Sequence, residues 1–429
     1  MDTQIWIDSG STAWVLISAA LVMFMTVPAL GLFYGGLVKR KNVLAIMMHS
    51  FAPLLVVSVI WVMFGYSLAF SDTEIIPGIL GDFKFGFLNG ISPLDPSPYF
   101  VSSDGGRIPH FAFIMFQCMF AVITPAVISG AFAERLKFSS FLLFTVIWTI
   151  FIYIPLTHMV WSKNGLLASM GIMDFAGGLV VEINSGFSAL AAALIIGKRR
   201  VKRISPPHNM TYTVIGAAML WFGWFGFNAG SGLAADGVAT IAFLNTNTTA
   251  AIAGLTWVFL DWVLQKKPTI LGVATGAVAG LVAITPGAGY INPAGAMILG
   301  VLTALVCYGM VMYVKPLLGY DDSLDAFGVH GIAGLIGSLF VGLFADPLMT
   351  AGTAMASGKG FAGVFFGGGI GVFGTQALGS LIAMGIAFLG TGLIFFILDK
   401  IGKLRVSEFD ESIGLDLTQH NERAYTIIE

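Results

Sequence analysis

The sequence predicts an all-α membrane protein that crosses the bilayer many times. Of its 429 residues, 57% are hydrophobic and only 10% are charged, and the mean hydropathy is +0.88. A water-soluble domain carries about 25% charged residues, so this composition does not suffice to cover a water-facing surface. The 54 glycines suit helices that pack closely in lipid. The net charge of −2 gives no indication of nucleic-acid binding.

Eleven apolar segments are long enough to cross a bilayer, which takes about 20 residues. The N-terminal stretch "MDTQIWIDSGSTAW" is acidic and lacks the basic start of a cleavable signal peptide, so the first segment is expected to be a true span. Breaks at charged residues and at Gly, Pro and Asn place the spans at 11–38, 43–70, 110–133, 138–160, 174–197, 209–232, 238–264, 269–287, 294–314, 324–346 and 366–399.

The basic residues orient these spans, because cytoplasmic loops are rich in Lys and Arg. Only Lys84, Arg107, Lys163 and Lys359 fall on the other side, and Arg423 lies in the C-terminal tail. The asymmetry predicts an N-terminus outside and a C-terminus in the cytoplasm. The sixteen residues on the cytoplasmic side are Lys39, Arg40, Lys41, Arg135, Lys137, Lys198, Arg199, Arg200, Lys202, Arg203, Lys266, Lys267, Lys315, Lys400, Lys403 and Arg405.

The expected organisation is a membrane domain over 1–403 and a polar tail over 404–429 that includes six acidic residues. Two long loops, 71–109 and 347–365, are expected on the outer side. The tail is either a docking or regulatory segment or a solvated chain end, and composition slightly favours the latter. Cys118 and Cys307, the only cysteines, both lie in apolar runs and are expected to be buried small residues rather than a disulfide or metal site.

Spans 5 and 10 share an internal pattern. Asp174 precedes Glu182 by eight residues, and Asp322 precedes His330 by eight. Both stretches, "DFAGGLVVEINSG" and "DSLDAFGVHGIAG", place Val before the ionisable residue and a glycine, Gly186 or Gly334, four residues after it. The pattern predicts two inverted five-helix repeats, about 11–200 and 209–346, followed by a last helix at 366–399. Repeats of this kind commonly place their site near the bilayer midplane.

The repeat predicts that Glu182 and His330 are neighbours. Eight helical residues rise about 12 Å, and the two spans run in opposite directions through a core about 30 Å thick. Ionisable residues at this depth usually mark a pathway, a relay or a paired site. The alternatives are a protonated Glu182 bonded to a neighbouring helix and a His330 bonded to a backbone carbonyl. Asp174 and Asp322 are expected to cap helix starts.

Aromatic residues point to a narrow passage near the outer side. The stretch "WFGWFGFNAGSG", residues 221–232, alternates glycines with rings and ends near Ser231. Rings beside small residues are suited to gating a pore or to binding a cation. Trp161 follows "HMV" at the outer end of span 4, where a membrane-interface anchor is the alternative. No nucleotide loop or selectivity-filter sequence is present, so the residues indicate a conduit for a small solute.

The sequence resembles the ammonium transporter family (Amt/Mep, related to Rhesus proteins), in particular its bacterial and archaeal Amt members. The similarity covers nearly the whole chain, and the motifs "VPALGLFYGGLVKRKNVL", "GAFAERLKF", "YIPLTHMVW", "DFAGG", "WFGFNAGS", "TPGAGYINP" and "DAFGVHGIAG" stand in the family's order. The resemblance implies eleven spans, inverted repeats and homotrimers with one pore per subunit.

The resemblance also implies roles for individual residues. An outer recruitment site would consist of Trp161 and Ser231, closed from below by Phe120 and supported electrostatically by Asp174. Phe120 and Phe227 resemble the stacked gate of the pore, whereas Asp322 would be structural. His330 matches one member of the family's twin histidines. Glu182 stands where most members have His, although some, notably fungal ones, also have Glu.

The implied function is transport of ammonium across the cytoplasmic membrane, without an enzymatic step, cofactor or metal. Ammonium would lose a proton at the outer site, ammonia would pass the gate, and Glu182 and His330 would relay the proton, so that transport is electrogenic. The alternatives are a passive ammonia channel and an ammonium sensor that signals through a PII-type protein. The tail "LRVSEFDESIGLDLTQHNERAY" resembles the segment on which PII-type proteins dock in bacterial and archaeal members, which revises the composition-based interpretation.

Overall fold

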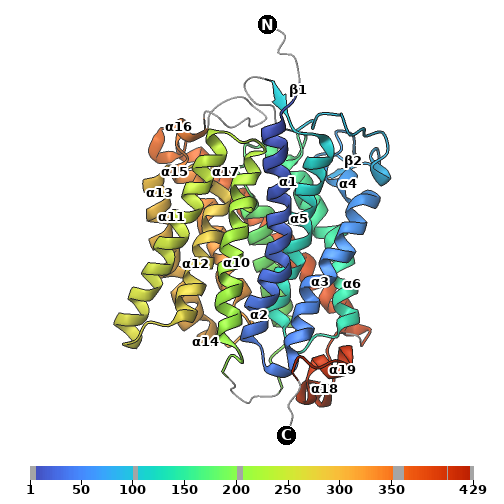
Figure 1. Cartoon of the computed structure of the whole chain (residues 1–429), viewed down its shortest axis with the longest axis vertical. Coiled ribbons are helices and arrows are strands. Elements are labelled where there is room, and N and C mark those ends of the chain that lie inside the picture. The colour runs from blue at the N-terminus through green and yellow to red at the C-terminus, as the bar shows by residue number, and fades with distance from the viewer. Residues whose placement is uncertain (1–5, 100–104, 201–205, 351–361, 403, 426–429) are drawn as a thin grey trace.

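The structure, a computed structural model, describes residues 6–99, 105–200, 206–350, 362–402 and 404–425. Within these ranges eleven helical segments are long and apolar enough to cross a membrane. They stand side by side as one bundle, with the N-terminus at one end and the C-terminus at the other (Figure 1), as an odd number of crossings requires. Lys202, Arg203, Lys359 and Lys403, which contributed to the predicted orientation, lie outside the described residues.

The observed spans confirm the predicted number and lie close to the predicted bounds. Span 4 is the main difference, because a short helix continues it to Ser169. Spans 5 and 10 begin a few residues later than predicted, so that Asp174, expected to open span 5, precedes it, as Asp322 was expected to precede span 10. The spans are Ser9–Leu37, Arg40–Phe70, His110–Phe132, Phe138–Ser169, Gly178–Ile196, Met210–Gly232, Gly237–Gln265, Ile270–Gly287, Pro293–Leu318, Phe327–Phe344 and Ile370–Lys400.

Most spans combine α-helix with a short π-helical or 3-10 turn. The first five consist of α1 (Ser9–Phe24), η1 (Met25–Leu30), α2 (Gly31–Leu37), η2 (Arg40–Asn42), α3 (Val43–Ile60), η3 (Trp61–Gly65), α4 (Tyr66–Phe70), α5 (His110–Ile128), η5 (Ser129–Phe132), α6 (Phe138–Trp148), η6 (Thr149–Tyr153), α7 (Ile154–Trp161), α8 (Leu166–Ser169), η7 (Gly178–Ile183) and α9 (Asn184–Ile196).

The remaining spans consist of α10 (Met210–Ala229), η8 (Gly230–Gly232), α11 (Gly237–Leu260), η9 (Asp261–Gln265), α12 (Ile270–Ile284), η10 (Thr285–Gly287), α13 (Pro293–Gly309), η11 (Met310–Val314), α14 (Lys315–Leu318), η12 (Phe327–Gly331), α15 (Ile332–Phe344) and α17 (Ile370–Lys400).

Equivalent spans of the two repeats pack against each other. Helix α1 contacts α10, and η7 and α9 of span 5 contact α15 and η12 of span 10. The last span, α17, packs on both α9 and α15. Spans 5 and 10 therefore lie in the interior of the bundle, where most of their residues are buried.

The two ends of the bundle carry different small elements (Figure 1). The outer end has the parallel pair β1 (Trp6–Ile7) and β4 (Gly106–Arg107), the antiparallel pair β2 (Glu74–Ile76) and β3 (Leu80–Gly81), and the short helices η4 (Gly86–Leu88), α16 (Pro347–Thr350) and η13 (Val364–Phe366). The cytoplasmic end has the tail helices α18 (Glu408–Ile413) and α19 (Leu415–His420).

The tail is fixed to the start of span 2. The Asp416 carboxylate accepts the backbone N–H of Ala45 at 2.8 Å, and the Leu415 N–H donates to Asn42 Oδ1 at 2.8 Å. Asp416 thus acts as an N-terminal cap that α3 receives from a distant part of the chain. Residues 404–425 of the tail form an ordered segment seated on the bundle and not a solvated end.

Candidate functional site

Glu182 and His330 meet in the middle of the bundle. Glu182 comes from the π-helical turn η7 and His330 from the equivalent turn η12. Glu182 Oε2 lies 2.7 Å from His330 Nδ1, and the residues are only 1% and 6% exposed. The short contact requires one proton between the two atoms, carried by either partner. The internal repeat predicted this central pair, and the structure confirms that the two residues are neighbours.

The glycines of the repeat explain how the two helices approach so closely. A Cβ on Gly186 would lie 2.1 Å from the Gly331 backbone, beside His330. A Cβ on Gly334 would lie 2.7 Å from Glu182 Cβ. Each glycine, four residues after one member of the central pair, therefore makes room for the opposite helix. Any side chain at either position would push Glu182 and His330 apart.

Asp174 organises the irregular segment that precedes span 5. Its Oδ1 accepts the N–H groups of Gly177 and Gly178 at 2.9 and 2.5 Å, and its Oδ2 accepts those of Leu179 and Val180 at 2.8 and 3.2 Å. These donors lack partners within the helix they begin. Asp174 thus caps the span as expected, although it stands before the helix rather than in it.

The outer aromatic cluster consists of Trp161, Phe120 and Phe227. The Trp161 ring stands edge-on to Phe120, with ring centres 5.8 Å apart, and Phe120 lies against Phe227 at 4.3 Å. Both phenylalanines are 1% exposed, whereas Trp161 is half-buried. Trp161 Nε1 donates to the Asp174 carbonyl at 2.9 Å, so Asp174 also orients the indole. The structure brings three of the predicted recruitment residues, Trp161, Phe120 and Asp174, together.

Ser231 lies in the turn η8, four residues after Phe227. Its hydroxyl donates to the Phe227 carbonyl at 2.8 Å, which leaves the lone pairs of its oxygen free to accept another hydrogen bond. The serine is therefore bonded to the backbone of the aromatic cluster. Ser231 is half-buried, like Trp161.

Two cavities meet at the central pair. The smaller has a volume of about 10 Å³, is lined by Glu182 and His330 and by apolar residues that include Phe227 and Trp224, and holds no more than a water-sized molecule. The larger has a volume of about 480 Å³ and extends from His330 past Tyr34 to Arg199 and Asp325 near the cytoplasmic end. The space is thus narrow and apolar above the central pair, and wide with a lining of both polar and apolar residues below it.

The part of the chain that the structure describes contains no group of three or more His, Cys, Asp or Glu side chains arranged to hold a metal ion.

Comparison with known proteins decides what this passage carries. Residues 13–425 match the family model described as Ammonium Transporter Family. The chain belongs to the ammonium transporter family. It is 46% identical to an ammonium transporter of Bacillus subtilis over 97% of this chain and 98% of the relative. An ammonium transporter of Aquifex aeolicus is 43% identical over 98% and 94% of the two chains.

The fold agrees with the family assignment. The crystal structure of Saccharomyces cerevisiae Mep2 superposes with a TM-score of 0.85 at 33% identity and covers 95% of this chain and 89% of that one. This ammonium transporter is therefore an eleven-span protein of the cell membrane that carries ammonium across it and is not an enzyme. These points confirm the predicted fold, family and location.

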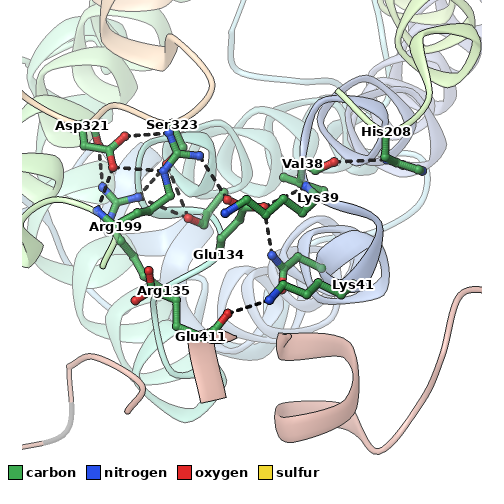
Figure 2. A network of polar contacts seen from close by, with 12 residues as sticks. Val38, Lys39, Lys41, Glu134, Arg135, Arg199, His208, Asp321, Ser323 and Glu411 are labelled. Carbon is green, nitrogen blue, oxygen red and sulfur yellow. Dashed lines mark hydrogen bonds and ion pairs between the residues drawn. The ribbon is translucent and has the colours of Figure 1, made fainter. Parts of the chain in front are cut away.

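Sequence reasoning missed a charged network at the cytoplasmic end of the transporter (Figure 2). Arg199 bonds Asp321 at 2.9 Å and Glu134 at 3.1 Å, and the buried Arg135 donates to Ser323 at 2.6 Å. Burial lowers the pKa of the Arg135 guanidinium to about 10. In the sequence analysis, Arg135 and Arg199 were used only to predict the orientation of the spans. The Glu134–Arg135 pair inside "GAFAERLKF" was the available sign of a structural role.

Sequence reasoning also missed residues that line the passage. Trp224 faces the small cavity and donates to Thr285 Oγ1 at 2.9 Å, and Tyr34 lines the large one. Trp224 stands in the aromatic stretch that was singled out, and Tyr34 in the motif "GLFYGG". Alternation of rings and glycines in the sequence does not distinguish rings that face the passage from those that face lipid.

Proposed function

We propose that this transporter deprotonates ammonium at its outer side and lets ammonia pass through the apolar cavity. The proton is relayed separately through Glu182 and His330. The observation that supports this most is the central pair at 2.7 Å in the wall of a cavity of about 10 Å³. A cavity of that size admits ammonia but not a hydrated cation. A buried acid and base in contact provide the place for the proton that ammonia leaves behind.

Recruitment takes place at Trp161 and Ser231 in this proposal. The half-buried indole offers a ring face, and attraction of a cation to such a face contributes about 0.5–2 kcal/mol. The Ser231 oxygen accepts a hydrogen bond from ammonium, because its own proton is committed to the Phe227 carbonyl. Asp174 supports the site by holding the indole N–H and by placing a carboxylate behind it.

The gate is formed by Phe120 and Phe227. The centres of their rings lie 4.3 Å apart. The two rings separate the half-buried Trp161 on the outer side from the small cavity at Glu182 and His330. An ammonium ion that entered this contact would lose its hydration without gaining a charged partner, which is strongly unfavourable. Neutral ammonia does not carry that penalty, so deprotonation comes before passage.

The central pair then holds the relayed proton as a unit. Glu182 and His330 interact too closely for the proton to belong to one residue alone. His330 also lines the large cytoplasmic cavity, where water regains access and ammonia is protonated again. Net charge therefore crosses the membrane with each ammonium, although ammonia and the proton cross as separate species.

Replacement of Glu182 tests the proton relay. Glu182→Gln keeps the shape of the side chain but removes the titratable group, so we expect the ammonium-driven current of proteoliposomes on a solid-supported membrane to fall at least about tenfold. Glu182→His, which recreates the pair found in most family members, is the control and should retain current. An unchanged current in Glu182→Gln contradicts the relay.

The same measurement addresses the alternatives. A passive ammonia channel would change the internal pH of the liposomes without producing current. A sensor that binds ammonium but scarcely transports it would do neither. The succession of the aromatic cluster, the small cavity at Glu182 and His330 and the 480 Å³ cavity, which also reaches His330, supports transport over sensing.

We also propose that the chain forms homotrimers with one passage per subunit and that a PII-type signalling protein docks on the tail. The proposal is supported by the resemblance of the tail, residues 404–429, and by its ordered seat on α3 through Asp416. Native mass spectrometry of the full chain and of a chain ending at residue 403, each with a PII-type protein, tests both points. Both the full chain and the chain ending at residue 403 should have the mass of a trimer. Only the full chain should form a complex with the PII-type protein.

A further inference from the structure

Gln376 in the last span is fully buried and bonded to one backbone position of another segment. The Met173 N–H donates to Gln376 Oε1 at 3.0 Å, and Gln376 Nε2 donates to the Met173 carbonyl at 2.6 Å. The second hydrogen of Nε2 goes to Ser338 Oγ at 3.0 Å. Because every amide hydrogen has an acceptor, the amide has only one orientation that satisfies all its partners.

Met173 belongs to a segment that has no regular structure of its own. Residues 171–177 connect α8 to η7, and their buried backbone groups must find partners outside a helix or sheet. Phe175 N–H donates to the Pro286 carbonyl at 3.1 Å, and Gln376 satisfies both groups of Met173. The place of this segment is therefore set by contacts from the second repeat and from the last span.

The next residue along the chain is Asp174, which orients the indole of Trp161. Its carbonyl is the acceptor for Trp161 Nε1 at 2.9 Å. Met173 is joined to Asp174 by a planar peptide group, so a displacement of Met173 shifts the Asp174 Cα, to which the acceptor carbonyl is attached. Gln376 thus acts on the Trp161 ring through one residue of backbone and one hydrogen bond, without touching the ring.

We infer that Gln376 is a positioning residue for the outer ammonium site, which fixes the Trp161 ring through Met173 and Asp174 and so sets the affinity for ammonium. The inference rests on the proposed recruitment of ammonium at Trp161. It gives the eleventh span, which lies outside both repeats, a role in substrate binding. The attraction between a cation and a ring depends on the cation lying over the ring face, so a tilted indole binds ammonium less well.

Gln376→Met tests the inference, because Met has a similar length and cannot bond either group of Met173. We expect the ammonium concentration for half-maximal current in proteoliposomes to rise about three- to tenfold, with a nearly unchanged maximal current. In a Trp161→Phe background the same substitution should change that concentration less than about twofold. Thr391→Val is the matched control, since it removes hydrogen bonds of the same helix to Trp148 and Ser188 but leaves Met173 alone.

The outcomes separate the two proposals. An equal rise in both backgrounds, or no rise in either, overturns the role of Gln376 while recruitment at Trp161 stands. If the Trp161→Phe single variant has the same ammonium concentration for half-maximal current as the wild type, recruitment at Trp161 is contradicted. The role of Gln376 is then tested by the fluorescence emission of Trp161. The emission of Trp161 is obtained by subtracting the spectrum of the same protein carrying Trp161→Phe. This emission should shift in Gln376→Met but not in Thr391→Val. Unchanged emission overturns the positioning role itself.

Discussion

The segments Asp174–Gly186 and Asp322–Gly334 share a spacing but are anchored differently. Asp174 accepts four backbone N–H groups, whereas Asp322 accepts two, from Ala326 and Phe327 at 3.1 and 2.8 Å. Both place an ionisable residue eight positions later in the central pair. The shared spacing builds the centre of the passage, and the differing anchors serve its two ends.

The two ends face different requirements. On the outer side Asp174 is joined to a half-buried ring, Trp161, and the nearby wall is aromatic. On the cytoplasmic side, the residue next to Asp322 is Asp321, which bonds Arg199 at the edge of the 480 Å³ cavity. The repeat therefore provides a symmetric scaffold for a transport path that is not symmetric. In the proposed mechanism, the aromatic, weakly charged end selects a small cation, and the salt-bridged end forms a fixed, hydrated exit.

The symmetry is strictest at the glycines, and we expect the largest effect there. Gly186→Ala places a methyl group 2.1 Å from the Gly331 backbone, and Gly334→Ala places one 2.7 Å from Glu182 Cβ. Both should separate the central pair and reduce ammonium current at least about tenfold, the more so for Gly186→Ala because its clash is with rigid backbone.

Gly385→Ala is the control for these two variants. It lies in the span α17, and its new methyl group would meet nothing within 4 Å. Its current should stay at the wild-type level. Thermal unfolding and size-exclusion profiles distinguish a moved central pair from a failure to fold. A folded Gly186→Ala protein with normal current would show that the contact between Glu182 and His330 is dispensable.

The next largest effect should be a difference in stability between variants of the two anchors, Asp174 and Asp322. In Asp174→Asn one of the two carboxylate oxygens becomes an NH2 group, which leaves two of the four N–H groups without an acceptor. In Asp322→Asn only one of the two N–H groups loses its acceptor. Each unpaired buried group costs about 1–3 kcal/mol, so Asp174→Asn should lower stability about twice as much. Thermal unfolding in detergent measures both, with the exposed Asp399→Asn as control. Equal losses would contradict the difference between the two anchors.

The sequence predicted those parts of the molecule that follow from local patterns. Hydropathy gave the spans, basic residues gave the orientation, and the repeat around Glu182 and His330 gave the central pair. Gly186 and Gly334 were noticed as part of the repeat, but their reason became clear only when the two helices were seen to cross at them.

The remaining parts depend on contacts between residues far apart in the chain. Gln376 and Met173 are 203 residues apart, and Arg199 and Asp321 are 122 apart. A buried Gln in an apolar span and an Arg in a basic loop look the same in sequence whether or not such partners exist. Neither residue repeats in the other half, so internal symmetry gave no second copy to compare.

The network at the cytoplasmic end should give the smallest of these effects and one that depends on pH. Burial disfavours the charge on Asp321, but Arg135 and Arg199 outweigh it and lower the pKa of that carboxyl. A lowered native pKa stabilises the fold above the unfolded value of about 4, and the contribution is lost as pH falls through the native value. Asp321→Asn should therefore lose about 1–3 kcal/mol at pH 7.

That loss should shrink as the pH falls below about 4, because the carboxyl of the unfolded chain is protonated there first and the folded carboxyl follows only at a lower pH. Thermal unfolding in detergent at pH 7 and at pH 3.5 measures the difference. Asp72→Asn, which breaks the exposed outer pair with Lys84 at 2.7 Å, is the control and should change stability by less than about 1 kcal/mol at either pH. A loss for Asp321→Asn that is the same at both pH values would mean that Asp321 acts through its shape rather than its charge. The cytoplasmic end would then resemble the outer end, where backbone hydrogen bonds rather than ion pairs hold the segment in place.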